Sequence, residues 1–262
     1  MSDSIRYAVD EGVATITFDR PDKLNAFTDP MLSALGKALR EAARDDAVRC
    51  LVLTGTGRAF SAGQDLADVS GRDASGGMRF REHLETTYNR AIAAIVEIEK
   101  PVIAAINGVA AGAGASIALA CDIRLMAEEA RLIMAFAGVG LVPDSGSTWF
   151  LPRMMGYERA FELAATGGRV TAAEALELGL VSRVVPGDAL AGAAQELAAR
   201  LATGPTKAIG LTKRAMRRAL TCRLDDALAY EAQLQEIAGG TADHREGVAA
   251  FLEKRPARFA GR

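Results

Sequence analysis

The segment from residue 107 to residue 115 reads Asn-Gly-Val-Ala-Ala-Gly-Ala-Gly-Ala, so every residue after the first is glycine, alanine or valine. Small side chains let another backbone or a ligand approach the main chain closely. The segment follows an apolar run, 101–106, that is typical of a buried strand, and it leads into a helix that we predict to end near Cys121. A helix that begins here leaves several N–H groups unpaired. The segment therefore indicates either a turn that faces a ligand or packing through small side chains.

Strand-like and helical segments alternate in the first half of the chain, whereas helical patterns dominate the second half. The alternation predicts an α/β core over residues 1–200, followed by a helical C-terminal region over residues 201–262. Asp29 and Pro30 are a typical N-cap and first-turn pair, and they predict a helix to about Arg44. A second early helix is expected at 80–98, and strands are expected at 5–9, 13–18, 50–54, 101–106, 122–126, 131–134 and 180–185.

Charge and hydropathy exclude several classes of protein. Lys plus Arg number 31 and Asp plus Glu number 33, so the net charge is −2, and we expect no nucleic-acid partner. The basic stretch 207–218 has helical spacing and indicates a solvated helix face. The chain shows neither the ~18 consecutive apolar residues of a membrane span nor an apolar signal core, so we expect a cytoplasmic protein without a membrane partner. Residues 69–78 are rich in Gly, Ser, Asp and Arg, and we interpret them as a mobile loop that could act as a lid.

Two further segments carry candidate functional residues. Residues 59–66, Ala-Phe-Ser-Ala-Gly-Gln-Asp-Leu, follow an expected strand, and a backbone N–H in such a turn can point at an anion or a carbonyl oxygen. The alternative is a plain strand-to-helix turn. Asp144 lies between an apolar stretch and the only tryptophan, Trp149; a carboxyl group in apolar surroundings has a raised pKa and suits proton transfer. The alternative role for Asp144 is the N-cap of the helix that follows.

Other common site types find little support. The only histidines, His83 and His244, have no partner at catalytic or metal-binding spacing, and we interpret both as surface residues. No Gly-x-Ser-x-Gly element suggests a Ser-His-Asp hydrolase. Gly112-x-Gly114 lacks the third glycine of a dinucleotide-binding turn, and there is no Gly-Lys-Ser/Thr element for nucleotide hydrolysis. The three cysteines lack metal-ligand spacing, so no metal site is expected.

Taken together, the motifs resemble the crotonase (enoyl-CoA hydratase/isomerase) superfamily, and the resemblance runs nearly end to end. It rests on Arg20-Pro21-x-x-Leu24-Asn25-Ala26, Ala-Gly-x-Asp at 62–65, Asn-Gly-x-Ala-x-Gly at 107–112, Gly-Leu-x-Pro at 140–143 and Glu246-Gly247-x-x-Ala250-Phe251-Leu252-Glu253-Lys254-Arg255. The resemblance implies a spiral core of repeated ββα turns with a helical trimerisation region at the C-terminus, assembled as a homotrimer or hexamer. It also implies an acyl-CoA thioester substrate, with coenzyme A as part of that substrate and no separate cofactor.

The resemblance further implies how the site would work. Members of the superfamily stabilise a thioester enolate with two backbone N–H groups, which match Gln64 and Ala113 in this chain. The hydratase branch uses two glutamates, and the matching positions hold Ser116 and Phe136. Isomerase branches place their working carboxylate where this chain has Asp144.

Coenzyme A binding is implied for two groups of residues. The first group lies in the N-terminal motifs and consists of Leu24, Ala26, Ala62 and Asp65. The second is the C-terminal Phe-x-x-Lys, here Phe251 and Lys254, which in the superfamily helps to hold the nucleotide end of coenzyme A, often across a subunit boundary.

The implied activity is that of an acyl-CoA isomerase. The motifs are most similar to those of isomerases that convert an arene epoxide thioester to an oxepin thioester, and the same site would also shift double bonds between positions 3 and 2 of an acyl chain. One rival is a hydratase that adds water to a 2-enoyl-CoA, which would need the second acid/base group that is missing here. Another is a non-catalytic acyl-CoA- or RNA-binding protein, against which the charge balance and Asp144 both argue. An acyl-CoA isomerisation assay separates the three.

Overall fold

Six strands form the larger of two sheets. The structure is a computed structural model that describes residues 4–67 and 79–262, so the segment interpreted as a lid, 69–78, lies outside the described residues. The strands of this sheet have the order β1-β2-β3-β5-β7-β10, in which β1 and β2 are antiparallel and the others run parallel to their neighbours. Their bounds are β1 (Ile5–Asp10), β2 (Val13–Phe18), β3 (Cys50–Gly55), β5 (Val102–Ile106), β7 (Ile123–Ala127) and β10 (Arg183–Val185).

The second sheet shows that the core is a spiral. Its order is β4-β6-β8-β9, with bounds β4 (Ala59–Ser61), β6 (Val109–Ala111), β8 (Arg131–Ile133) and β9 (Arg169–Thr171). The pairs β3/β4, β5/β6 and β7/β8 each give one strand to the large sheet and the next strand to the small sheet. The chain therefore winds through successive ββα turns, and the α/β fold with C-terminal helices that the sequence predicted is confirmed.

Glycines lie where one turn of the spiral crosses another. A Cβ atom on Gly108 would lie 2.2 Å from the carbonyl oxygen of Arg58, and one on Gly114 would lie 2.4 Å from that of Ser61. Both distances are far below a van der Waals contact, and the opposing atoms belong to the backbone. At Gly108 and Gly114, the small-residue segment 107–115 therefore allows two stretches of backbone to pack directly against each other.

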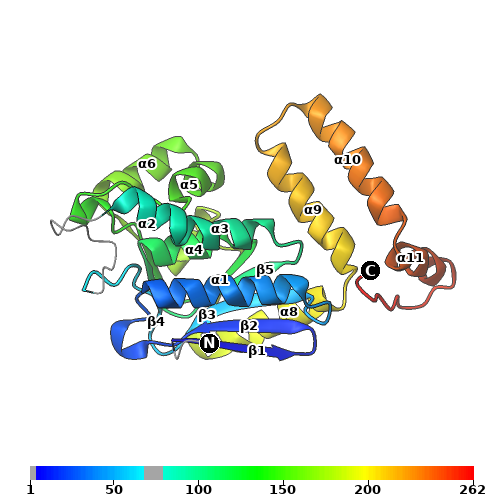
Figure 1. Cartoon of the computed structure of the whole chain (residues 1–262), viewed down its shortest axis with the longest axis horizontal. Helices are drawn as coiled ribbons and strands as arrows, with labels where there is room; N and C mark the ends of the chain where they lie inside the picture. Colours follow the sequence, from blue (N-terminus) through cyan, green and yellow to red (C-terminus); the bar gives the residue numbers. More distant parts are fainter. Residues whose placement is uncertain (1–3, 68–78) are drawn as a thin grey trace.

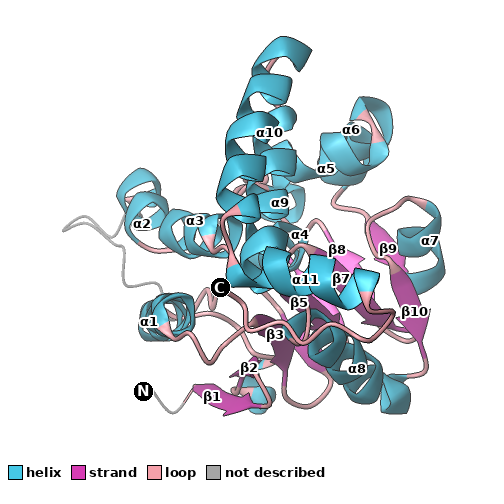
Figure 2. Ribbon diagram, turned by 90° about the vertical axis from the view of Figure 1, so that its right-hand side faces the viewer, coloured by secondary structure: helices cyan, strands magenta, loops and turns pink. Residues whose placement is uncertain are grey.

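The helices cover both sides of the large sheet. Helix α8 packs along one face, against β2, β3, β5 and β7, while α1 packs beside β1 and β2 (Figures 1 and 2). No helix within the described ranges is long and apolar enough to cross a bilayer. The helix bounds are α1 (Asp29–Arg44), α2 (Phe80–Thr86), α3 (Tyr88–Glu97), α4 (Ala113–Ala120), α5 (Ser147–Met155), α6 (Tyr157–Thr166), α7 (Ala172–Glu177), α8 (Leu190–Ala202), α9 (Thr206–Ala219), α10 (Leu224–Gly239) and α11 (Ala242–Leu252).

Three local predictions differ from the structure. The N-cap of α1 is Thr28 rather than Asp29, because the Thr28 side chain accepts a hydrogen bond from the amide of Met31. The helix expected at 80–98 is broken at Thr87, whose φ and ψ of −118° and −85° are not helical. The strand expected at 180–185 is reduced to β10, because the amides of residues 180 and 181 bond back to a carbonyl of α7.

Helix α9 docks on the core through its basic residues. Asp122 pairs with Lys213 at 2.8 Å and with Arg217 at 3.1 Å, and Glu99 pairs with Lys207 at 2.6 Å. The Lys213 side chain is only 8% exposed. The prediction that this basic stretch forms a solvated face is therefore wrong for Lys213 and Arg217, which pair with Asp122 of the core, whereas the Lys207 side chain remains 39% exposed.

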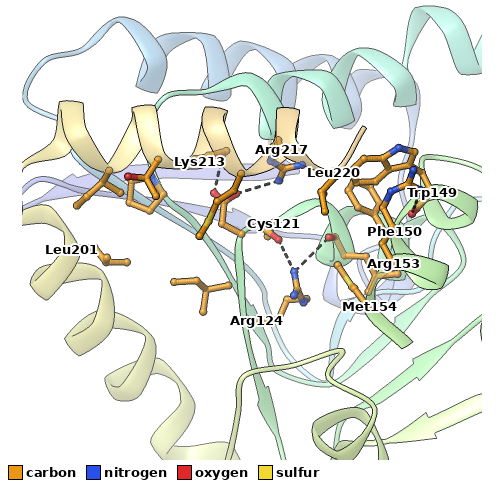
Figure 3. Close-up of a pocket in the computed structure, with 17 residues that line it drawn as sticks. Cys121, Arg124, Trp149, Phe150, Arg153, Met154, Leu201, Lys213, Arg217 and Leu220 are labelled. Carbon is orange, nitrogen blue, oxygen red and sulfur yellow. Dashed lines mark hydrogen bonds and ion pairs between the residues drawn. The ribbon is translucent and has the colours of Figure 1, made fainter. Parts of the chain in front are cut away.

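An apolar cavity of about 390 Å³ lies between α9 and the core (Figure 3). Its charged lining residues all have partners: besides the two ion pairs of Asp122, Arg124 donates to the carbonyl of Cys121 at 2.6 Å, and the guanidinium of Arg153 lies 4.2 Å from the ring centroid of Trp149. The cavity therefore offers an apolar surface without a polar group that is free for chemistry among its described lining residues.

Arg49 ties the start of β3 to the C-terminal part of the chain. Its guanidinium donates to Thr206 Oγ1 at 2.8 Å, to the carbonyl oxygen of Phe259 at 3.0 Å and to the carbonyl oxygen of Gly204. We call these three hydrogen bonds the Arg49 clasp. They fix the base of α9, which projects from the core as an antiparallel pair with α10 (Figure 1).

We predict that the protein assembles in solution as trimers or multiples of three. The C-terminal helices expose large apolar side chains, and such surfaces are commonly covered by other copies of a chain. The exposed residues include Met216, Leu220, Leu224, Leu228, Ile237, Val248, Phe251 and Leu252. Light scattering should give a mass of three or six chains at micromolar concentration, and a monomeric mass would contradict the prediction.

Candidate functional site

A cavity of about 150 Å³ collects most of the candidate functional residues. It is lined by residues that follow β4, by α2 and the start of α3, by the start of α4 and by the loop before α5. We call it the Asp144 cavity, and the lining residues that matter below are Gln64, His83, Tyr88, Ala113, Phe136 and Asp144. The ββα spiral brings these segments together, because β4 and β6 lie side by side and their last residues lead into the cavity.

The backbone amides of Gln64 and Ala113 have no described partner. Phe27 donates to the carbonyl of Gly63 at 2.7 Å and accepts from the amide of Asp65 at 2.9 Å. Because successive N–H groups of an extended chain point to opposite sides, the amide of Gln64 points away from Phe27. Ala113 is the first residue of α4, so its amide has no partner within the helix. In the described part of the chain neither amide donates to a backbone carbonyl.

Gly63 sets the distance between these two segments. Its φ is +89°, in the region that favours glycine. A Cβ atom at this position would lie 2.7 Å from the carbonyl oxygen of Ala111 and 3.3 Å from the amide nitrogen of Ala113. The absence of a side chain therefore lets the turn after β4 lie directly against the start of α4.

Asp144 is the one carboxylate among the described residues that line the cavity. Burial raises its pKa above the ordinary value, against the opposing effects of a 2.8 Å hydrogen bond from Ser145 Oγ and of the nearby His83. The alternative role of helix cap is wrong, because the N-cap of α5 is Gly146 and no side chain caps this helix. A carboxyl group of raised pKa beside a cavity can act as a proton acceptor and donor.

The two positions that match hydratase glutamates carry no acid/base group. Ser116 is fully buried, and its hydroxyl is 2.6 Å from that of Ser147. Phe136 contributes an apolar ring to the cavity wall. No group of three or more His, Cys, Asp or Glu side chains within residues 4–67 and 79–262 has the geometry to hold a metal ion.

The interpretation of His83 as a surface residue is wrong. His83 is 7% exposed, lines the Asp144 cavity and has its Nε2 atom 2.7 Å from Oδ1 of Asp29. Helix α2 turns His83 inward, against the start of α1. No local pattern in the sequence indicates this role, because the partner Asp29 lies 54 positions earlier.

Tyr88 is a second cavity residue that no motif in the sequence indicated. Its hydroxyl donates to Oε1 of Gln64 at 2.7 Å, and the Gln64 side chain in turn donates to the carbonyl of Phe27 at 3.2 Å. Burial and the negative charges of Asp144 and Asp29 raise the pKa of Tyr88, so it remains a neutral hydrogen-bond donor. Tyr88 therefore holds the side chain of Gln64 in place, and the backbone N–H of Gln64 takes no part in these hydrogen bonds.

The first group of residues expected to bind coenzyme A lies together next to the cavity. The amide of Ala62 donates to the carbonyl of Leu24 at 2.9 Å. Arg20 joins the other two, because it donates to the carbonyl of Ala26 at 2.6 Å and pairs with Asp65 at 3.0 Å. The loop that precedes α1 and the turn that follows β4 are thus one structural unit.

Phe251 and Lys254 are not brought to this unit within one chain. They lie in and just after α11, at the opposite end of the molecule from α2 (Figure 1). The Phe251 side chain is 82% exposed. Within one chain, the two groups of residues expected to bind coenzyme A therefore lie far apart (Figure 1).

Comparison with known proteins gives one consistent result. Residues 8–262 match the enoyl-CoA hydratase/isomerase family. The chain is 45% identical to the 1,2-epoxyphenylacetyl-CoA isomerase of Escherichia coli over 262 residues, which is the full length of both, and 35% identical to the short-chain-enoyl-CoA hydratase of Clostridium acetobutylicum over 93% of this chain and 92% of that protein. The crystal structure of an enoyl-CoA hydratase from Bacillus anthracis superposes with a TM-score of 0.93 at 34% identity, covering 99% of this chain and 100% of that one.

We predict that Gly63→Ala destabilises the protein by roughly 1–3 kcal/mol, the usual cost of forcing an extra group into a packed site. The added Cβ would collide with the Ala111 carbonyl, and the backbone conformation is unfavourable for alanine. Thermal unfolding at one fixed protein concentration measures the effect. Gly192→Ala is the matched control, because nothing lies within 4 Å of a Cβ atom there. Equal melting temperatures for the two variants would contradict the account of Gly63.

Proposed function

The chain belongs to the enoyl-CoA hydratase/isomerase (crotonase) family, and within this family we propose that it is an acyl-CoA isomerase. The observation that carries the proposal is the composition of the Asp144 cavity. One carboxylate with a raised pKa shares it with Gln64 and Ala113, whose backbone amides have no partner among the described residues, while Ser116 and Phe136 occupy the positions of the hydratase glutamates. Isomerisation needs a proton to be removed and returned, whereas the hydratase branch uses two glutamates, and neither is present at the matching positions of this chain.

The proposed reaction begins with removal of a proton from C2 of the acyl group by Asp144. Negative charge then develops on the thioester oxygen, and the amides of Gln64 and Ala113 stabilise it as an oxyanion hole. Each well-placed donor of this kind contributes roughly 3 kcal/mol to the transition state. Return of a proton at a second carbon completes the shift of the double bond. The donors belong to the backbone, so the side chains at 64 and 113 need not take part.

We propose ring 1,2-epoxyphenylacetyl-CoA as the substrate, converted to an oxepin thioester, with 3-enoyl-CoA isomerisation as a second activity of the same site. Full-length identity of 45% to an isomerase named for this epoxide supports the choice. The apolar wall formed by Phe136 and Leu141 also suits an uncharged ring. Coenzyme A would be held by Leu24, Ala26, Ala62 and Asp65, and by Phe251 and Lys254 of a neighbouring copy.

Asp144→Asn should lower isomerisation by roughly 10²–10⁴-fold, the usual contribution of a positioned acid/base group. Asparagine keeps the size of the side chain but cannot accept the proton, so exchange of C2 hydrogens with deuterated water should stop as well. In the parent protein, kcat/KM should fall as the pH drops through the raised pKa of Asp144, because only the ionised carboxylate is a base.

The exposed Asp188 provides the control, and Asp188→Asn should behave like the parent. Melting temperature and acyl-CoA affinity of Asp144→Asn should also stay close to those of the parent. Near-parental isomerisation and exchange in Asp144→Asn would show that this carboxylate is not the base.

We expect hydration of crotonyl-CoA to be slow or absent. Ser116 and Phe136 supply no acid or base to activate water, although some relatives in the family are hydratases. The test is loss of the enoyl absorbance on incubation with purified protein. Turnover on the order of 10³ s⁻¹, at the upper end of common enzyme rates, would replace the isomerase proposal with the hydratase alternative.

A further inference from the structure

His83 is a second group able to carry a proton in the Asp144 cavity. Its side chain is only 6% exposed, and it lines the same cavity of about 150 Å³ as Asp144. The two side chains come from different elements, α2 and the loop before α5, so their convergence is a product of the tertiary fold. The cavity is small enough for one acyl chain to contact both.

Asp29 determines which nitrogen of His83 can exchange a proton with a ligand. The Nε2 atom lies 2.7 Å from Oδ1 of Asp29. An ionised carboxylate only accepts hydrogen bonds, so Nε2 carries a hydrogen and donates it to Asp29. Nδ1 is then the ring nitrogen that remains for proton exchange, and the bond to Asp29 fixes the tautomer and orientation of the ring.

The orientation of the ring is fixed by a further contact. The ring of Tyr88 meets that of His83 edge to face, with 5.9 Å between the centroids. Among the described residues, the titratable groups that contact or influence His83 are Asp29 from α1, Tyr88 from α3 and Asp144 from the loop before α5. Tyr88 stays neutral, so within residues 4–67 and 79–262 Asp29 and Asp144 are the carboxylates near His83.

We propose that His83 delivers the proton to the second carbon in the isomerisation, while Asp144 removes the proton from C2. This proposal rests on the proposed isomerase function. With a 3-enoyl-CoA, Asp144 takes the C2 proton and becomes a carboxylic acid, and the electron pair spreads over the dienolate. The imidazolium of His83 then gives its Nδ1 proton to C4, which yields the 2-enoyl-CoA and a neutral imidazole. Transfer of the proton from Asp144 to His83, directly or through water, restores the starting state.

Two proton-carrying groups, Asp144 and His83, avoid a geometric difficulty that a single proton-carrying group would face. One carboxyl group that serves both carbons must move along the acyl chain between the two transfers, or the substrate must move past it. Ser145 holds Oδ1 of Asp144 at 2.8 Å, and Asp29 holds His83 at 2.7 Å, so each group is held by its own partner and need not move between two carbons. Removal and delivery of the proton are then separable steps, and this is what an experiment can detect.

The test compares isomerisation of a 3-enoyl-CoA with exchange of its C2 hydrogens in deuterated water. His83→Gln keeps an amide N–H for Asp29 but cannot transfer a proton. It should lower isomerisation by about 10²-fold or more, the usual effect of losing an acid/base group, while C2 exchange stays within a few-fold of the parent. Asp29→Asn, which keeps an acceptor for Nε2 but removes the charge, should show the same pattern with a smaller loss.

The control is His244→Gln, an exposed histidine on α11, which should match the parent in both readouts. Retention of isomerisation in His83→Gln would overturn the proposal. Equal loss of isomerisation and exchange, as expected for Asp144→Asn, would also overturn it, because His83 would then act through Asp144. A parent protein that neither isomerises nor exchanges would instead refute the isomerase function on which the proposal rests.

Discussion

The backbone of Gly108 packs against that of Arg58, and the backbone of Gly114 packs against that of Ser61. At neither contact is there room for a side chain on the glycine. These crossings hold successive ββα turns at a fixed spacing, and two asparagines complete them. Asn25 donates to the carbonyl oxygens of Thr56 and Ala59, and Asn107 accepts from the amide of Gly55 at 3.1 Å. The polar groups freed at the corners are thereby satisfied inside the protein, as buried backbone groups must be. The position of every later turn follows from these contacts.

The candidate site is a consequence of the same spacing. Gly63 rests against the carbonyl of Ala111, so the turn after β4 and the start of α4 lie directly against each other at one cavity. In the proposed mechanism the thioester oxygen is held by the main chain, which the spiral fixes, while proton transfer depends on side chains of α2 and of the loop before α5. Enzymes of one family that act on different acyl groups can therefore keep the main-chain donors and change the side chains that transfer protons.

The sequence predicted those parts of the fold and site that depend on short-range pattern. Apolar runs such as 101–106 identified strands, and the small-residue segment identified a close approach. Asp144 stood out because it follows a proline within an apolar stretch. His83 did not, because its role depends on Asp29, 54 positions away, and on the inward turn of a helix. The basic face of α9 was misjudged for a similar reason: periodicity marks a face, but the carboxylates that it meets, Glu99 and Asp122, lie about a hundred positions earlier.

Helix α8 also bears on how the chain acquires its shape during synthesis. Strands β2, β3, β5 and β7 pair in chain order, so each can join the sheet soon after it leaves the ribosome. The face that α8 covers stays bare until residue 202 has been made, and ribosomes add roughly 5–20 residues per second. For several seconds the growing chain therefore exposes an apolar sheet, and the Arg49 clasp closes only after α8 has sealed it. The nascent chain is most in need of a chaperone in this interval, after its sheet has formed and before its last core helix exists.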